Sequence, residues 1–205
     1  MGKPVILSTG MAAEAEVRDA VKFFSINGNK LGNLVLLQCN TNYPARLEDQ
    51  NLRALGILKK YVPIVGYSDH TEGLESSISA VALGAKVIER HLTLDKKMSG
   101  PDHGASLNPE EFSNFVRSVR TAELVLGKTK KWPSGGEAEN IVAMRRSICA
   151  KDDIPAGARL TEALFTYKRP GDGLYPTNAN INKLIGKKAK YNILADENIT
   201  LDKVV

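Results

Sequence analysis

The chain has 205 residues, of which 42% are hydrophobic and 25% are charged, the composition of an ordinary folded protein. The sequence contains no run of about 18 apolar residues, the length needed to cross a membrane, and its first residues lack the apolar core of a signal peptide. The formal net charge of +5 comes from scattered Lys and Arg side chains without interleaved aromatic residues, which gives no support to a nucleic-acid platform. We therefore expect a cytoplasmic protein with neither a membrane nor a nucleic acid as its partner.

Four short apolar runs predict β-strands, and they cover residues 4–8, 34–39, 64–67 and 86–92. Helical patterns follow each run, at residues 13–24, 51–60, 73–83 and 109–126. The last helix has the strongest boundaries, because Asn108 is a suitable N-cap, Pro109 suits the first helical position and Gly127 suits the end. The strict alternation of strand and helix predicts four βα units and hence a parallel sheet covered by helices.

The ends of the predicted strands favour a (β/α)8 TIM barrel over an open doubly wound sheet. Each strand ends in polar, reactive residues, namely Ser8-Thr9-Gly10, Asn40-Thr41-Asn42, Ser68-Asp69-His70 and Glu89-Arg90-His91. A barrel collects its chemistry at the carboxyl ends of several strands, whereas an open sheet concentrates it at one switch point. We therefore expect an α/β barrel in which only about the last four βα units are present.

The first domain is about half as long as a closed barrel requires. A closed barrel takes roughly 250 residues, and the four predicted units end near residue 127. We expect the first half of the barrel to lie on a polypeptide outside this sequence. A dimer of two half-barrels is the alternative.

A second domain follows a change of composition. We assign residues 1–127 to the half-barrel, residues 128–144 to a linker rich in Lys, Gly, Pro, Ser and Glu, and residues 145–205 to a small module. Residues 153–161 and 192–200 echo each other as short turns between apolar positions, which is a weak internal repeat. Short segments bounded by turns predict a compact, mostly β module with a limited core.

The three histidines of the chain all fall between positions 70 and 103. His70 and His91 end consecutive strands, which lie about 4.8 Å apart in a parallel sheet, so both imidazoles can reach one metal ion. Alternation along each strand puts Ser68 on the same face as His70 and Glu89 on the same face as His91. Two nitrogen ligands with oxygen ligands and open positions suit Mn²⁺ or Mg²⁺, although zinc also binds imidazole.

Other polar strand ends are weaker candidates when judged from chemistry alone. Ser8 precedes a predicted helix, whose N-terminus suits phosphate or carboxylate. The stretch Thr41-Asn42-Tyr43-Pro44 could bind a ligand or be a polar turn stopped by proline. Asp102 lies in a Gly-Pro turn, where aspartate serves local hydrogen bonding as readily as catalysis.

At these residues the sequence resembles the N-acetylneuraminate synthase family, which includes synthases of sialic, legionaminic and pseudaminic acids and related spore-coat proteins. The resemblance spans nearly the whole chain, and taken in order its motifs are highly specific. They are Ile6-Leu7-Ser8-Thr9-Gly10-Met11, Tyr43-Pro44, Gly66-Tyr67-Ser68-Asp69-His70-Thr71, Val81-Ala82-Leu83-Gly84-Ala85, Glu89-Arg90-His91, Gly100-Pro101-Asp102-His103 and Lys168-Arg169-Pro170-Gly171. The resemblance implies that the second domain is the antifreeze-like (SAF, β-clip) domain of that family.

The resemblance also implies an activity, the condensation of phosphoenolpyruvate with an N-acetylated aldose such as N-acetylmannosamine. The products would be a nine-carbon 2-keto acid and phosphate. By the same likeness, His70 and His91 would hold Mn²⁺ (or Mg²⁺) and Glu89 would move protons. Because the family's first four strands supply a phosphate-binding lysine and further acid-base groups, we expect weak activity or none from this polypeptide alone.

The substrate-binding residues are likewise implied by the resemblance. The positions that match phosphoenolpyruvate-binding residues are Ser8, Thr41 and Ser68, and those that match the sugar and metal surroundings are Tyr43, Glu89 and Asp102. Arg169 matches the arginine that the antifreeze-like domain inserts into the partner's active site, which implies a domain-swapped homodimer. Without the resemblance, Arg169 is interpreted as a surface arginine before a Pro-Gly turn.

Two other classes of function are compatible with the sequence. One is a non-catalytic carbohydrate-binding remnant, whose sugar binding would not depend on a metal. The other is a metal-dependent aldolase or isomerase on a barrel assembled from two half-barrels, which would need no phosphoenolpyruvate.

Overall fold

A computed structural model describes residues 3–205 of the chain. The chain divides after Thr129 into two compact units, and each is described by itself. The first unit contains the parallel sheet, and the second contains a small antiparallel sheet.

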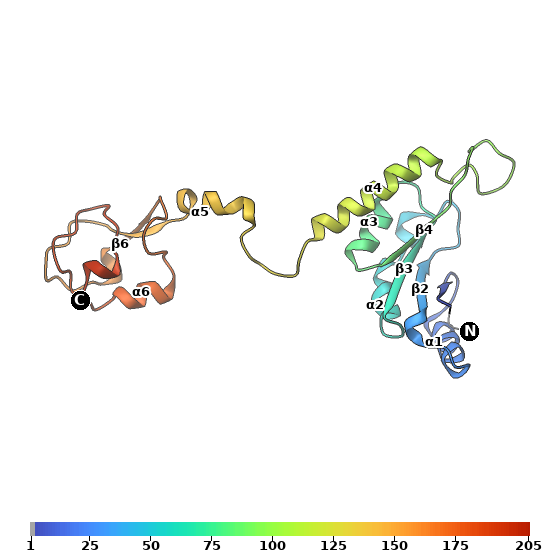
Figure 1. Cartoon of the computed structure of the whole chain (residues 1–205), viewed down its shortest axis with the longest axis horizontal. Coiled ribbons are helices and arrows are strands. Elements are labelled where there is room, and N and C mark those ends of the chain that lie inside the picture. Colours follow the sequence, from blue (N-terminus) through green and yellow to red (C-terminus); the bar gives the residue numbers. More distant parts are fainter. Residues whose placement is uncertain (1–2) are drawn as a thin grey trace. The chain divides into compact units, whose positions relative to one another are not determined.

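The first unit consists of four βα units, as the alternation of strand and helix predicts (Figure 1). Its strands are β1 (Val5–Ser8), β2 (Leu34–Cys39), β3 (Ile64–Asp69) and β4 (Val87–Arg90). Its α-helices are α1 (Glu14–Ile26), α2 (Leu55–Leu58), α3 (Glu75–Ala82) and α4 (Pro109–Leu126). Short 3-10 turns lie at η1 (Leu31–Asn33), η2 (Leu47–Asp49) and η3 (Leu52–Ala54).

The sheet has the sequential order β1-β2-β3-β4, and all pairs are parallel. The predicted strands are confirmed, with three differences in length: β1 begins one residue later than the predicted 4–8, β3 runs on to Asp69, and β4 is shorter than the predicted 86–92. The helix predicted at 51–60 is wrong at its start, where a 3-10 turn precedes the short α2. Asn51 has a left-handed backbone with φ 47°, so a right-handed helix cannot begin there.

The hydrophobic core of the first unit lies between the sheet and one layer of helices. Leu34 and Leu36 of β2 are buried in it with Val65 and Tyr67 of β3, alternate residues that point to the same face. The helices contribute buried side chains from α1, α2 and α3, which are Val17, Val21, Leu55, Leu58 and Ala80. Figure 1 shows β2, β3 and β4 side by side with α2 and α3 next to them.

The opposite face of the sheet contains a glycine that allows close packing between strands. Gly66 lies opposite Val87 of β4 and Leu37 of β2. A Cβ at Gly66 would lie 2.3 Å from the Val87 carbonyl oxygen and 2.5 Å from Leu37 Cδ2. This face therefore accepts no side chain at position 66. Toward β1 the same face opens, and Ile6 is 55% exposed.

Helix α4 begins as the sequence predicts. The Asn108 side chain accepts a hydrogen bond from the Glu111 backbone N–H, and the Glu111 carboxylate accepts one from the Asn108 N–H. This reciprocal capping box satisfies two backbone donors that a helix start leaves free. Phe115 is the buried residue of the helix, whereas Leu124 and Val125 near its end are about 80% exposed.

The second unit contains less regular β-structure than the sequence suggests. Its two strands, β5 (Ser147–Ala150) and β6 (Phe165–Lys168), form the antiparallel sheet. The remaining elements are η4 (Gly135–Glu137), α5 (Ala138–Met144), η5 (Glu162–Leu164), α6 (Asn178–Leu184) and η6 (Leu201–Lys203). Isolated bridges take the place of longer strands, for example between Ile154 and Ile193.

The two echoing segments of the second unit pair with each other. Ile154 and Ile193 exchange both backbone hydrogen bonds, at 2.8 and 2.9 Å. The Asn192 side chain accepts from the Ala156 N–H, and the Asp153 carboxylate accepts from the equivalent Ala195 N–H. The weak sequence repeat therefore corresponds to a local pseudo-twofold arrangement around the two buried isoleucines.

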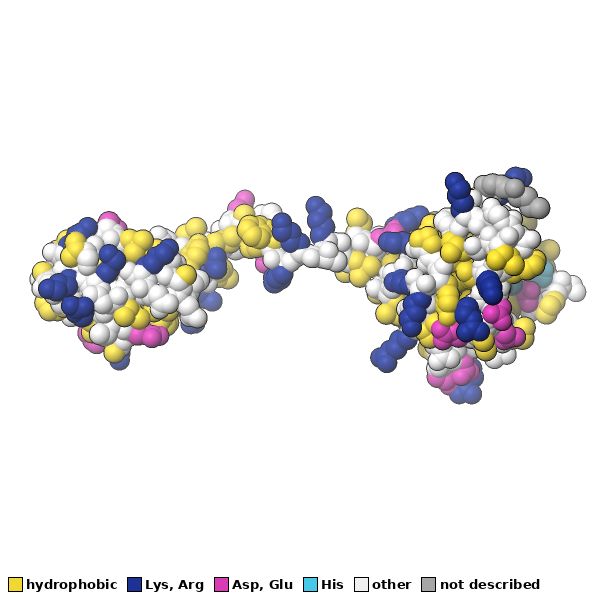
Figure 2. All heavy atoms as spheres, turned by 90° about the horizontal axis from the view of Figure 1, so that it is seen from below, with side chains coloured by type: hydrophobic (Ala, Val, Ile, Leu, Met, Phe, Trp, Pro, Cys, Tyr) yellow, Lys and Arg dark blue, Asp and Glu magenta, His cyan; other side chains and the backbone are white. Residues whose placement is uncertain are grey.

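Part of the segment assigned to a linker is ordered as η4 and α5. Glu137 closes a capping box with Ser134, and the Gly171 N–H donates to the Val142 carbonyl at 2.6 Å, so α5 belongs to the second unit. The sequence does not predict α5, because Gly135 and Gly136 of η4 lie directly before it. Within residues 3–205 no helix combines the length and apolarity needed to cross a membrane. Figure 2 shows Lys and Arg side chains at separate places on both units, which matches the scattered charge of the sequence.

Candidate functional site

The parallel register brings three candidate residues to one face of the sheet, opposite the helices. Ser8 lies beside Leu37, Cys39 beside Ser68, and Ser68 beside Glu89. His70 and His91 follow β3 and β4 directly. The polar strand ends therefore form one continuous edge across the sheet, at the position where barrel enzymes carry their chemistry.

Three aromatic rings meet at this edge. The ring centroids of His70 and His91 are 5.1 Å apart, and Tyr43 lies 5.2 Å from His70 and 4.4 Å from His91. The Tyr43 hydroxyl is 3.1 Å from the Ser106 hydroxyl, which joins it to the loop after β4. Both histidines are partly buried, so their rings have few alternative positions.

The hydrogen bond of His70 leaves one ring nitrogen available. Its Nδ1 lies 2.7 Å from the carbonyl oxygen of Asn40, which makes Nδ1 the protonated nitrogen and Nε2 the free one. The Nδ1 of His91 is 3.8 Å from the Asp102 carboxylate. A histidine that is oriented through one nitrogen in this way is a typical metal ligand through the other.

Ser68 and Glu89 form a pair beside the histidines. The buried Ser68 hydroxyl donates to Glu89 Oε1 at 2.7 Å, while Glu89 itself is exposed. The prediction that these two side chains share a face is confirmed. Cys39 lies next to this pair, and burial is the main reason that the pKa of its thiol is raised, with a further contribution from the nearby Glu89 carboxylate.

Tyr67, Asp69 and Arg90 alternate with the site residues along β3 and β4, and their side chains point to the helical face of the sheet, as alternation predicts. Arg90 donates to the Asp69 carboxylate at 2.8 Å, and both side chains are almost completely buried. The Tyr67 hydroxyl donates to Gln50 Oε1 at 2.7 Å and lies 3.3 Å from Asp69 Oδ1. Burial together with the Asp69 charge raises the pKa of Tyr67, so this phenol stays protonated.

Ser8 and Thr41 lie on neighbouring exposed strand ends. A Cβ at Gly10 would lie 2.5 Å from Thr41 Cγ2, so the glycine after β1 allows the loop after β2 to approach. Thr9 reinforces this approach by donating from its hydroxyl to the Leu37 carbonyl at 2.8 Å. Asp102 is exposed in the loop before α4, near His91.

Arg169 lies in the second unit, directly after β6. Its Nε donates to the Met144 carbonyl at 2.8 Å, and the residue is exposed. Arg145 is stacked over the Tyr175 ring at 4.0 Å in the same unit.

Sequence reasoning missed several residues of the site. Asn40 acts through its backbone carbonyl, which has no sequence signal. Ser106 depends on the path of a loop. Cys39 could have been found, because it is two residues before Thr41 and alternation brings it onto the face of Ser68.

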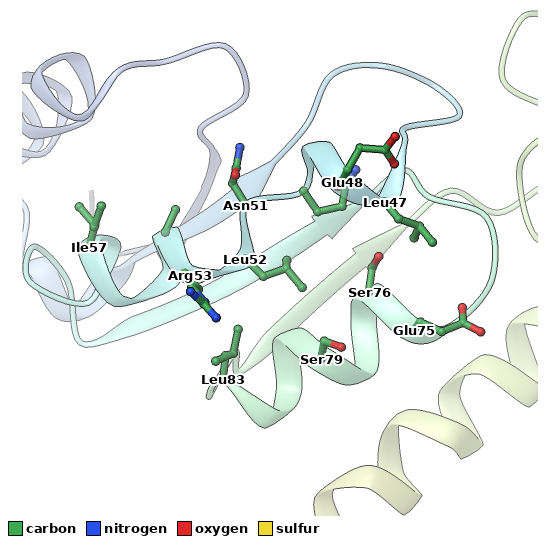
Figure 3. Close-up of a pocket in the computed structure, with 12 residues that line it drawn as sticks. Leu47, Glu48, Asn51, Leu52, Arg53, Ile57, Glu75, Ser76, Ser79 and Leu83 are labelled. Atoms are coloured by element: carbon green, nitrogen blue, oxygen red, sulfur yellow. The ribbon is translucent and has the colours of Figure 1, made fainter.

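The two histidines are the candidate metal ligands that the structure brings together. In the part of the chain that the structure describes, no group of three or more His, Cys, Asp or Glu side chains could hold an ion. A separate pocket of about 660 Å³ lies between the α2 region and α3, with Leu52 on one side and Ser76 and Ser79 of α3 on the other (Figure 3). None of the candidate site residues lines that pocket.

A sheet of sequential βα units with polar side chains gathered at the strand carboxyl ends is the arrangement of barrel-type enzymes. Residues 1–131 match the NeuB family, and residues 145–205 match the SAF domain. The chain therefore belongs to the NeuB family and has a SAF domain after the sheet. The resemblance to N-acetylneuraminate synthases is confirmed.

Named relatives carry synthase functions. The N,N'-diacetyllegionaminic acid synthase of Campylobacter jejuni is 44% identical over 96% of this chain and 59% of its own length. The N-acetylneuraminate-9-phosphate synthase of Mus musculus is 38% identical over 99% of this chain and 56% of its own length. The solved sialic acid synthetase of Leptospira borgpetersenii, in complex with citrate, has a TM-score of 0.60 and 36% identity over 67% of this chain and 48% of that chain. The chain thus spans a little over half the length of the curated relatives.

Proposed function

We propose that the chain is part of a synthase that condenses phosphoenolpyruvate with an N-acetylated aldose to give a nine-carbon 2-keto acid and phosphate. The observation that carries the proposal is the convergence of His70, His91, Tyr43 and the Ser68–Glu89 pair at one edge of the sheet. The names of the relatives support the same chemistry. Four further strands of an eight-stranded barrel would be supplied by polypeptide outside this sequence.

The donor set suits a divalent cation such as Mn²⁺ or Mg²⁺. His70 has a free Nε2 because its Nδ1 bonds the Asn40 carbonyl, and His91 lies with its ring centroid 5.1 Å away. Two imidazoles leave coordination positions for water and substrate oxygens, as catalytic metal sites require. When bound, the cation would polarise the sugar aldehyde as a Lewis acid.

The remaining side chains would bind the substrates and move protons. Ser8, Thr41 and Ser68 would bind phosphoenolpyruvate, whose C3 carbon attacks the aldehyde carbon. Water then adds at C2 and phosphate leaves. Because Ser68 occupies Oε1 of Glu89, Oε2 is the oxygen free to take or give a proton.

Sugar recognition would involve the second unit as well as the first. Tyr43 and Asp102 would contact the sugar beside the cation. Arg169 would reach the active site of a second subunit in a domain-swapped homodimer, where its planar guanidinium can donate two parallel hydrogen bonds to the acyl group. Phosphoenolpyruvate, the aldose and a second subunit are thus the proposed partners.

The test is phosphate release from phosphoenolpyruvate in the presence of Mn²⁺ and a panel of N-acetylated aldoses. The chain is assayed alone and mixed with the first half-barrel of the Campylobacter jejuni relative, expressed separately. We expect release in the mixture, abolished by His70→Ala and retained by Arg120→Ala, which removes an exposed ion pair on α4. If both folded pieces together release no phosphate, the synthase proposal is wrong. Metal-independent sugar binding in that case would indicate a carbohydrate-binding remnant.

A further inference from the structure

The residues directly before the two histidines form a buried ion pair. Asp69 precedes His70 and Arg90 precedes His91, and their side chains point to the helical face of the sheet while the imidazoles lie at the open edge. Arg90 Nη1 lies 2.8 Å from Asp69 Oδ2, and the side chains are 3% and 0% exposed. Such a pair gives little net stability compared with apolar packing, so its place between the two histidines points to a role other than stability.

The Asp69 carboxylate holds the chain on both sides of His70. Its Oδ1 accepts from the Thr71 N–H at 2.8 Å and from the Thr71 hydroxyl at 2.7 Å. Its Oδ2 accepts from Ser77 of α3 as well as from Arg90. Asp69 therefore fixes the backbone around His70, because it is hydrogen-bonded to Thr71 on the far side of His70 and to Ser77 of α3.

The Arg90 guanidinium connects the second histidine to the same segment. Besides Asp69, it donates to the Gly73 carbonyl at 2.8 Å and to the Thr71 carbonyl. It also lies over the Phe115 ring of α4, 5.5 Å from the centroid. The end of β4 is thereby fixed to the loop that follows His70, by a fork of donors that lysine cannot reproduce.

We propose that Asp69 and Arg90 are positioning residues that fix the spacing of the His70 and His91 rings, so that both imidazoles can bind one divalent cation. The cation part of this inference rests on the proposed function, whereas the spacing of the rings does not. Removing an outer group that orients a metal ligand typically reduces metal affinity about 10- to 100-fold, and Asp69 and Arg90 would act through the backbone beside each histidine.

The decisive variants differ in how much of the ion pair they remove. Asp69→Asn keeps the shape of the side chain but leaves Arg90 buried without its anion. Arg90→Lys keeps the charge and removes the fork. Val65→Ala is the matched control, because it weakens the buried core on the same strand and touches neither histidine.

Two measurements are made on the whole chain. Proton NMR of the metal-free protein detects nuclear Overhauser effects between the Tyr43, His70 and His91 rings, and water-proton relaxation measures Mn²⁺ binding. In Asp69→Asn we expect the ring contacts to be lost and the Mn²⁺ affinity to fall about 10- to 100-fold. In Arg90→Lys we expect weakened ring contacts and a smaller loss of Mn²⁺ affinity. Val65→Ala should keep the contacts and the affinity despite its lower melting temperature.

Each outcome decides the inference. If folded Asp69→Asn keeps the ring contacts, or if Val65→Ala loses them equally, the pair is merely structural. Should Asp69→Asn fail to fold, unchanged ring contacts in Arg90→Lys overturn the inference and weakened ones support it. If the parent chain binds no Mn²⁺, the proposed metal site is wrong, and the ring contacts alone test the positioning.

Discussion

The two units of the chain bury their apolar side chains in different ways. In the second unit Ile148, Leu160, Ile193 and Ile199 are completely buried, and segments from the whole unit surround them. In the first unit the helices cover one face of the sheet, and the opposite face carries the polar site and the exposed Ile6. The first unit therefore keeps its stabilising core and its candidate chemistry on opposite sides of the same four strands.

The largest expected effect comes from truncating a core side chain in each unit. Leu36→Ala in the first unit and Ile193→Ala in the second should each reduce the free energy of unfolding by about 2–5 kcal/mol, because both side chains are fully buried. Hydrogen exchange followed by mass spectrometry should show lost protection only in the unit that carries the change. Equal loss of protection in both units would mean that they unfold as one.

A smaller effect is expected from adding one methyl group at Gly66, where β3 lies close to its neighbouring strands. Gly66→Ala should reduce the free energy of unfolding by about 1–3 kcal/mol, because the new Cβ meets the Val87 carbonyl. Chemical denaturation measures the change. The control is Gly56→Ala in α2, where a Cβ meets nothing within 4 Å and should add about 0.5–1 kcal/mol of stability. A neutral Gly66→Ala would show that β3 and β4 separate easily.

Substitution on the open face of the first unit should have little effect. Ile6→Thr is expected to change the free energy of unfolding by no more than about 0.5 kcal/mol, because Ile6 is 55% exposed. The same denaturation experiment measures it. A loss well above about 1 kcal/mol would indicate that this face is covered in solution, and analytical ultracentrifugation would then identify self-association.

The smallest expected effect is a change in the alkylation rate of Cys39 relative to Cys149. Burial raises the pKa of both Cys39 and Cys149, so each thiol should react slowly with iodoacetamide near pH 8 and faster as the pH rises. Since the Glu89 carboxylate adds to the rise at Cys39, Glu89→Gln should lower the pKa of Cys39 and speed its alkylation. Mass spectrometry of each cysteine peptide measures the rates. Cys149, in the second unit, is the internal control, and an equal change there would contradict the assignment.

Much of the first unit could be predicted from its sequence because its signals are local. Apolar runs bounded by polar residues define the strands, and alternation correctly assigns Ser68 and Glu89 to one face and Asp69 and Arg90 to the other. Asn108 determines the start of α4 through its own side chain. Each of these features depends on residues close together in the chain.

The features that could not be predicted depend on contacts between distant residues. The Tyr43 ring lies against both histidines only because the loop after β2 folds over the ends of β3 and β4. The Asn40 carbonyl that orients His70 belongs to the backbone. In the second unit, the bridge between Ile154 and Ile193 joins two similar segments, and the sequence shows their similarity but not their pairing.

The two polar pairs that join β3 to β4 also protect the sheet against misalignment during folding. Ser68 pairs with Glu89 on one face and Asp69 with Arg90 on the other, in adjacent rungs of the ladder. A shift of one residue would turn Arg90 to the open face and bury the Asp69 carboxylate without a cation. An incorrectly aligned sheet would thus lose both pairs at once, and this penalty makes the native alignment the one that the chain retains.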